Sequence, residues 1–299
     1  MSKCVSVIIP SYNRAHLLEK TIPSYLQEDV GEVIIVDDAS TDNTFAVVKK
    51  LQSKYQQIKY VKMPVNSKQT IAKNEGIKHA KYSYIYFGDD DSFITNNTIK
   101  ILLDCLIEMK ADVVGAKALY MDNASDYENI DAFISHKSKR FNSEKKINKY
   151  LDILNLYHIS FDWDFDKPIK VPFCHACALV KKESIRNIRF DRDYGGNAFR
   201  EETDFFTRIS AAGFKIYYNS KAMQINLPRS TVLKGNSFIK YKIRAVIYEF
   251  INTYKYLKKN REFLNSYYSS FNNYKIVFLK YLFTALRIKS IKCIRILFK

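Results

Sequence analysis

The chain has 299 residues, 47% of them hydrophobic and 14% aromatic, so it can bury a sizeable core and is not a disordered protein. Its five cysteines are scattered and odd in number, which excludes a disulfide framework. Residues 229–299 contain 16 Lys and Arg against 2 Asp and Glu and thus carry +14 of the formal charge of +17, which marks a separate basic segment with an anionic partner.

Apolar runs of strand length alternate with helix-forming segments in the N-terminal part of the chain. Buried strands are predicted at residues 5–9, 33–36, 58–61 and 83–87, and helices at residues 17–26, 45–51, 71–80 and 99–109. Alternation of this kind is typical of a parallel sheet covered on both faces. We therefore expect an α/β fold of Rossmann type, with a mostly parallel sheet flanked by helices.

The pattern continues less regularly after residue 110. Strands are predicted at residues 112–120, 171–180 and 214–218, a helix at 201–211, and a loop or excursion without periodicity at 121–150. Beyond Pro228, apolar residues recur at helical spacing over residues 239–257 and 274–298, with lysines and arginines mostly beside them. These features predict one domain over residues 1–228 and a basic, amphipathic helical tail over residues 229–299.

Carboxylates follow two of the predicted strands directly. Asp37 and Asp38 end the second strand, and three adjacent acids, Asp89, Asp90 and Asp91, follow the fourth. Packed like charges repel unless a cation neutralises them, and carboxylate oxygens suit Mg²⁺ or Mn²⁺ shared with substrate phosphates. The carboxyl ends of parallel strands also meet in one crevice, where such sheets bind ligands. The pattern favours a cation site over the alternative, a solvated acidic turn.

The turn after the first strand, residues 9–14, contains no glycine. A dinucleotide fingerprint and a P-loop both require glycines at this point, so the turn cannot cradle phosphate with its backbone. The Tyr12 ring can instead stack on a base, and Asp38 can accept a hydrogen bond from a base N–H. This arrangement favours a nucleoside beside the first two strands and a diphosphate, with metal, at residues 89–91.

Five segments, in this order along the chain, carry a family resemblance: residues 5–14, 34–42, 73–77, 87–91 and 200–208. Together they resemble the motifs of the inverting, GT-A-fold glycosyltransferases of family 2, and the resemblance covers roughly residues 4–227. It implies a nucleotide-sugar-binding catalytic domain. The donor contacts that it implies come from Pro10, Tyr12, Arg14, Asp38, Lys73, Asp89 and Asp90. It further implies that Asp91, with Asp89, binds Mn²⁺ or Mg²⁺, a Lewis acid for the leaving diphosphate.

The same resemblance implies a general base in the acidic segment 200–208. Glu202 aligns with the family's usual Asp, and would deprotonate the acceptor hydroxyl. Glu201 and Asp204 are alternatives, because they are three residues apart and would share one helix face, with Glu202 pointing elsewhere. A second departure from the family is Asn226, which stands where members often carry a His as a further metal ligand.

The function that the resemblance implies is transfer of a sugar from a nucleotide-diphosphate sugar, UDP-linked, to a hydroxyl of a glycan or lipid-linked acceptor in surface polysaccharide synthesis. Three alternatives remain. A sugar-nucleotidyltransferase would need a glycine-rich, basic loop near the N-terminus. A phosphohydrolase would use an aspartate of the triplet as nucleophile. A non-catalytic glycan- or membrane-binding homologue is favoured by Asn226.

The tail and the N-terminus indicate where the protein works. Aromatic and aliphatic residues lie among the lysines of residues 235–299, which is typical of a helix on an anionic membrane surface. A solvated face or a partner subunit is the alternative; no nucleic-acid module is recognisable, so nucleic acid is not expected. No apolar run approaches the roughly 18 residues of a spanning helix, and no secretory signal precedes the first strand. We expect a cytoplasmic protein, peripheral on the inner face of the cell membrane.

Overall fold

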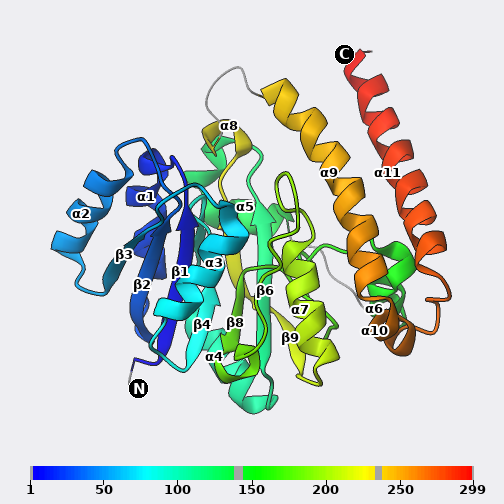
Figure 1. Ribbon diagram of the computed structural model, residues 1–299, viewed down its shortest axis with the longest axis horizontal. Coiled ribbons are helices and arrows are strands. Elements are labelled where there is room, and N and C mark those ends of the chain that lie inside the picture. Colours follow the sequence, from blue (N-terminus) through cyan, green and yellow to red (C-terminus); the bar gives the residue numbers. More distant parts are fainter. Residues whose placement is uncertain (1–2, 138–143, 233–237, 298–299) are drawn as a thin grey trace.

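The computed structural model describes residues 3–137, 144–232 and 238–297 (Figure 1). The strands are β1 (Val5–Ser11), β2 (Val30–Asp37), β3 (Ile58–Lys62), β4 (Tyr84–Phe87), β5 (Ser92–Ile94), β6 (Val113–Tyr120), β7 (Ile169–Lys170), β8 (Ala178–Lys181) and β9 (Ile216–Asn226). The α-helices are α1 (Ala15–Thr21), α2 (Thr44–Lys54), α3 (Lys68–His79), α4 (Thr98–Glu108), α5 (Ile130–Lys137), α6 (Glu144–Leu151), α7 (Glu201–Ala211), α8 (Arg229–Val232), α9 (Phe238–Lys259), α10 (Arg261–Tyr267) and α11 (Tyr274–Leu297).

The strands form one sheet in the order β3-β2-β1-β4-β8-β6-β9-β5, with β7 paired to β9. The pairs β1–β2, β1–β4, β2–β3 and β6–β9 are parallel, as predicted. Strand β8 lies antiparallel between β4 and β6. It is shorter than the predicted strand 171–180, because only residues 178–181 find partners and the backbone before them is irregular.

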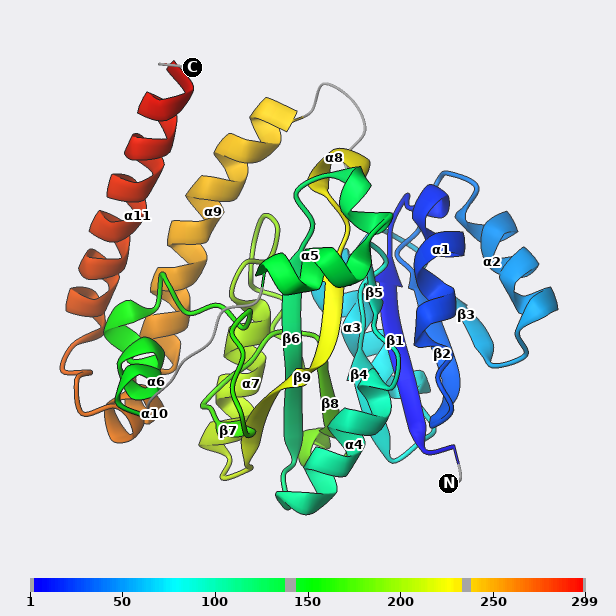
Figure 2. The same ribbon diagram turned by 180° about the vertical axis from the view of Figure 1, so that it is seen from behind.

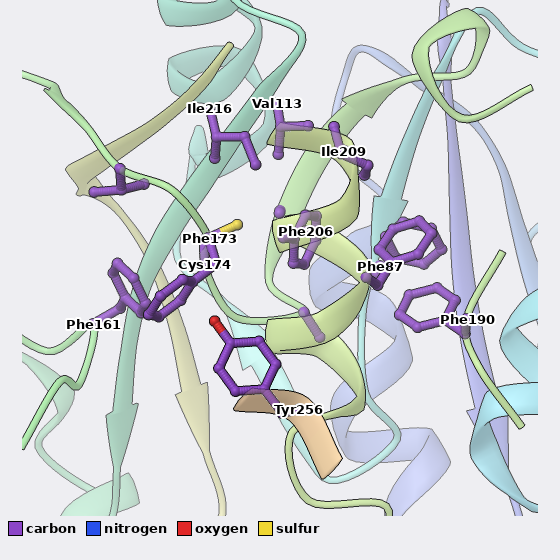
Figure 3. Close-up of a cluster of buried hydrophobic side chains, with 14 of the residues drawn as sticks. Phe87, Val113, Phe161, Phe173, Cys174, Phe190, Phe206, Ile209, Ile216 and Tyr256 are labelled. Atoms are coloured by element: carbon purple, nitrogen blue, oxygen red, sulfur yellow. The ribbon is translucent and has the colours of Figure 1, made fainter. Parts of the chain in front are cut away.

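Two apolar clusters cover the two faces of the sheet. Helices α1, α2 and α4 pack on one face through residues such as Leu18, Val48 and Leu102. Helices α3 and α7 pack on the other, where Phe205 of α7 lies against Phe87 of β4. Figure 3 shows the second cluster around α7. This layering holds the carboxyl ends of β1, β2 and β4 along one edge.

The C-terminal helices belong to the second cluster. Tyr256 and Leu257 of α9 and Tyr281 of α11 are buried in the same core as Phe206 of α7, and Figure 3 shows Tyr256 beside the α7 side chains. Helices α9 and α11 lie side by side at one end of the sheet in both views (Figures 1 and 2). Of the apolar stripe read from the α9 sequence, Leu257 is buried in this core and Phe250 packs against it, whereas Ile247 and Ile251 remain exposed.

Two local expectations were wrong. Residues 121–150, expected to be a loop, contain α5, the start of α6 and the 3₁₀ turn Ala124–Tyr127, while residues 138–143 lie outside the described part. Isolated apolar anchors such as Phe133, which is buried in a small third cluster, suffice to dock these short helices. The first helix ends at Thr21 instead of residue 26, because the chain tightens into a 3₁₀ turn that contains Pro23.

None of the described helices combines the length and the apolarity that a bilayer crossing requires.

Candidate active site

A cavity of about 460 Å³ opens where β1, β2 and β4 end. Its walls contain these residues that the sequence singled out: Pro10, Tyr12, Arg14, Asp38, Asp89, Asp90 and Asp91. Gly196, Asn197 and Ala198, from the loop before α7, form another part of the wall. The structure therefore brings together residues that are far apart in the chain.

The turn after β1 is locked to the turn after β2. Asn13 has a left-handed backbone conformation, with φ of 54°. Its side-chain oxygen accepts a hydrogen bond from the Thr41 N–H at 2.8 Å, and its own N–H donates to Ser40 Oγ at 2.9 Å. The turn holds Tyr12 at the cavity with 43% of its surface exposed. The ring is thus available to a planar ligand.

Asp38, predicted to contact the donor, also makes structural hydrogen bonds. Its two carboxylate oxygens accept hydrogen bonds from the Ser67 and Lys68 N–H groups, each at 2.7 Å. Burial raises the pKa of Asp38, although these two hydrogen bonds oppose the shift. Asp38 therefore fixes the start of α3 against the end of β2.

The backbone of the acidic triplet is held by three hydrogen bonds to its carbonyl oxygens. The Tyr25 hydroxyl donates to Asp89 O at 3.1 Å, and Thr21 Oγ1 donates to Asp90 O at 3.1 Å. The Leu227 N–H donates to Asp91 O at 2.8 Å. The triplet is thus a rigid part of the sheet edge.

The side chains of the triplet are half-buried and close to one another. Burial raises the pKa of both Asp89 and Asp90 to about 7, and the charge of Asp91 adds to the shift. For Asp89, the nearby Lys73 charge opposes the shift. Burial and the neighbouring carboxylates thus disfavour the ionised form of Asp89 and Asp90, and a bound divalent cation would stabilise it.

The donor set fits Mn²⁺ or Mg²⁺. All its atoms are hard oxygens, and such ions are commonly held by one or two carboxylates together with substrate phosphates. Within the described residues no three His, Cys, Asp or Glu side chains are grouped so that they could hold a metal ion by themselves. Asp89 and Asp91 would therefore share the ion with a bound diphosphate. Asn226, in register with Ser92 next to the triplet, has its side-chain nitrogen bonded to Leu119 O at 3.0 Å.

Gln224 of β9 orients Asp89 and was missed by the sequence analysis. Its Nε2 donates to Asp89 Oδ2 at 3.0 Å, while its Oε1 accepts a hydrogen bond from the Tyr86 hydroxyl at 3.0 Å. Because an ionised carboxylate only accepts hydrogen bonds, Asp89 fixes the amide nitrogen toward itself and leaves Oε1 to the Tyr86 hydroxyl, which can donate. No local pattern around residue 224 signals this contact.

Lys73 of α3 is a buried cation shared by two acids at the start of α7. Its Nζ lies 3.0 Å from Glu201 Oε1 and 2.6 Å from Glu202 Oε1, and the lysine side chain is 1% exposed. Burial lowers the pKa of Lys73, but the charges of Glu201 and Glu202 outweigh burial and raise it well above its usual value. The lysine predicted to approach the diphosphate thus holds the acidic helix start to α3.

The two glutamates differ in surroundings. Glu201 is buried, and its Oε1 also accepts a hydrogen bond from Gln69 Nε2. Glu202 keeps 25% of its side chain exposed, and its Oε2 accepts from the Ala176 N–H at 3.1 Å. Burial raises the pKa of both, yet Lys73 brings the pKa of Glu202 below its usual value, whereas that of Glu201 stays raised. The charge of Glu202 also raises the pKa of Asp89, so the two carboxylates lie close enough to repel each other.

Asp204 does not join this group. It is fully buried, and its carboxylate is bonded to Arg208 Nε at 2.8 Å, to Lys259 Nζ at 2.9 Å and to Asn260 Nδ2 at 2.9 Å. The expectation that Glu201 and Asp204 share a face, with Glu202 elsewhere, was wrong. Lys73 forms ion pairs with both Glu201 and Glu202 in the first turn of α7, whereas Asp204 faces the tail helices.

Comparison with known proteins identifies the family of this chain. The family model of glycosyl transferase family 2 matches residues 6–189. The chain is 29% identical over 197 residues to the GalNAc(5)-diNAcBac-PP-undecaprenol beta-1,3-glucosyltransferase of Campylobacter jejuni, covering 64% of this chain and 56% of that protein. It is 32% identical over 206 residues to glycosyltransferase GlyG of Streptococcus pneumoniae, covering 68% and 64%. The matches span less than two thirds of these relatives.

Solved structures share the fold. The mannosyltransferase PcManGT of Pyrobaculum calidifontis, in complex with GDP-Man and Mn²⁺, superposes with a TM-score of 0.59 at 16% identity, over 97% of this chain and 76% of that one. S. aureus TarS 1–349 in complex with UDP gives a TM-score of 0.54 at 18% identity, over 90% and 72%. These likenesses establish a GT-A-like architecture.

Removing the Lys73 charge should destabilise the fold. In Lys73→Met, two buried carboxylates lose their cation, and we expect a loss of about 3–5 kcal/mol in the free energy of unfolding at pH 7. The loss should shrink below about pH 5, because uncompensated buried carboxyls take up protons more readily than unfolded ones. Urea unfolding at both pH values measures it. Lys78→Met, on the exposed side of α3, is the control and should change stability by less than about 0.5 kcal/mol.

Proposed function

The chain belongs to glycosyl transferase family 2, and we propose that it transfers a sugar from a UDP-linked donor to a hydroxyl of a glycan or lipid-linked acceptor in cell-surface polysaccharide synthesis. The observation that carries this proposal is the cavity in which Tyr12 and Asp38 face the acidic triplet. A nucleoside beside the tyrosine would place its diphosphate at the carboxylates. The names of the relatives, which act on an undecaprenol-linked glycan in one case, support the acceptor class.

Donor binding uses the first part of the site. Pro10, Tyr12 and Asp38 contact the base and ribose, and Arg14 and Asp90 border the same space. Asp91 and Asp89 would hold Mn²⁺ or Mg²⁺, which would supply Lewis-acid chemistry by neutralising charge on the leaving diphosphate. The charge of Lys73 favours the ionised form of Asp89, because it lowers the pKa of that carboxyl.

Glu202 is the proposed general base. A quarter of its side chain is exposed, its pKa lies below the usual value, and it is therefore ionised at neutral pH. The acceptor hydroxyl gives its proton to this carboxylate as its oxygen attacks the anomeric carbon. Attack from the face opposite the diphosphate inverts the configuration, and the C–O bond to the diphosphate breaks. Glu201 is enclosed by Lys73 and Gln69, and Asp204 faces away, so neither is favoured.

The tail carries a second proposal, that the protein lies on an anionic membrane surface on the cytoplasmic side. On α11, Ile276, Leu279, Phe283 and Leu286 are exposed on the side opposite the buried Val277 and Tyr281. Exposed Lys275, Lys280 and Arg287 lie among them. Insertion of the apolar side chains with cations at the headgroups is the mode of an interfacial helix.

Asp91→Asn should weaken metal-dependent donor binding while preserving shape. With Mn²⁺ present, we expect the UDP dissociation constant, measured by calorimetry, to rise at least about tenfold, since even residues that only support metal ligands change affinity by that much. Asp104→Asn on exposed α4 is the matched control. Unchanged Mn²⁺-dependent affinity in Asp91→Asn would remove this carboxylate from the metal site.

Glu202→Gln should separate binding from chemistry. The amide has the same shape but accepts no proton, so we expect kcat to fall about 10²- to 10⁴-fold with UDP affinity within about twofold of the parent. Release of UDP in the presence of donor, Mn²⁺ and a lipid-linked acceptor measures turnover, with exposed Glu262→Gln as control. Full activity in Glu202→Gln would transfer the role of base to Glu201. A parent chain that binds UDP but transfers nothing would favour the non-catalytic homologue.

Membrane binding is best tested by substitution, because deleting residues 235–299 would uncover the core around Tyr256. Leu279→Glu with Phe283→Glu places two charges on the exposed face of α11. Co-sedimentation with vesicles containing anionic phosphatidylglycerol should fall at least about tenfold, because both apolar insertion and charge attraction are reduced. Asn265→Glu with Asn272→Glu adds the same charge elsewhere on the tail. Equal loss in both variants would indicate attraction by net charge alone, without insertion of α11.

A further inference from the structure

The loop before α7 is shaped by the tail helix α9. A Cβ atom at Gly195 would lie 2.4 Å from Tyr248 Cε1, and one at Gly196 would lie 2.4 Å from Tyr248 Cδ2. Gly196 also has a left-handed backbone, with φ of 64°. The glycine pair therefore lets the tyrosine ring of α9 lie directly against the loop backbone.

Hydrogen bonds from α9 reinforce this contact. Asn252 Nδ2 donates to Gly195 O at 3.0 Å, and the asparagine is 1% exposed. The same Gly195 oxygen accepts the Ala198 N–H at 3.0 Å, the bond that closes the turn over residues 195–198. Lys255 Nζ adds a bond to Asp193 O at 2.9 Å. Asn252 thus braces the turn whose residues 196–198 line the cavity.

The acidic helix is tied to the tail at separate points. Asp204 of α7 binds Lys259 Nζ and Asn260 Nδ2, each at 2.9 Å, and the Thr207 and Tyr256 hydroxyl oxygens are 3.1 Å apart. These contacts do not involve Asn252 or Tyr248. A change at Asn252 or Tyr248 therefore leaves these ties of α7 to the tail in place, while the Glu201 N–H, which donates to Ala198 O at 2.9 Å, joins the turn to the helix start.

We propose that α9 positions the wall of the donor site, with Asn252 and Tyr248 as positioning residues for the 195–198 turn. This inference rests on the proposed function, since it takes the cavity to be the site of the nucleotide-diphosphate donor. Neither residue contacts the donor. With these contacts the 195–198 turn is already ordered before the donor binds. Without them, binding must also order the turn, and that cost lowers the affinity for the donor. Chemistry on a bound donor depends on Glu202 and is left nearly unchanged.

The test uses the full-length chain with Asn252→Leu, which leaves the half-buried Gly195 oxygen without the donor of its second hydrogen bond. We expect hydrogen exchange in the peptide over residues 193–200 to accelerate about tenfold, and the UDP dissociation constant with Mn²⁺ and the donor KM to rise about tenfold. The value of kcat should stay within about twofold, a split that a general loss of structure would not produce. Asn265→Leu, on the exposed side of α10, should change none of these quantities.

A second pair of variants guards against misfolding of Asn252→Leu. Tyr248→Ala removes the ring that lies on the glycines and should reproduce the faster exchange and the higher KM, whereas Tyr248→Phe keeps the ring and should behave as the parent.

Unchanged exchange in Asn252→Leu and Tyr248→Ala would overturn the bracing. Faster exchange with unchanged UDP affinity would overturn the link to the donor. A parent chain that binds no UDP would refute the proposed function itself, and with it the donor role of the turn, while the exchange data still report on bracing.

Discussion

Negative charge is concentrated along one edge of the sheet, and the buried Lys73 holds part of it in place. The lysine binds Glu201 and Glu202 at the start of α7 and acts through its charge on Asp89 at the end of β4. Burial raises the pKa of Asp89 and Asp90, neighbouring carboxylates add to the shift, and the charges of Lys73 on Asp89 and Arg14 on Asp90 only partly oppose it. The remaining negative charge makes the edge a good receptor for a divalent ion that arrives with a diphosphate.

The tail covers the core and also contacts the loop that lines the cavity. Residues of α9 and α11 are buried with those of α7, and Asp204 accepts a hydrogen bond from Lys259 at the end of α9. One side of the tail therefore faces the catalytic helix while the other presents apolar and basic side chains to the outside. The proposed contact with an anionic surface and the proposed positioning of the cavity wall would then belong to the same pair of helices.

Much of the fold could be predicted because its first strands are contiguous apolar runs, each followed by its own helix. The antiparallel insertion of β8 could not, since its pairing with β4 and β6 joins segments far apart in the chain. The triplet was visible because its carboxylates are adjacent. Gln224 and Asn252 were not, because each acts on a distant partner, Asp89 and Gly195, and nothing nearby in sequence marks the contact. The face shared by Glu201 and Glu202 was likewise decided by a lysine on another helix.

The central claim is that a cation bridges the acidic triplet and a nucleoside diphosphate. Its most direct test is a crystal structure of the chain with UDP and Mn²⁺. The account predicts manganese within bonding distance, about 2.0–2.3 Å, of an Asp91 oxygen and a diphosphate oxygen, with the uracil beside Tyr12. Nucleotide bound elsewhere, or a triplet that faces solvent without metal while UDP occupies the protein, would contradict it.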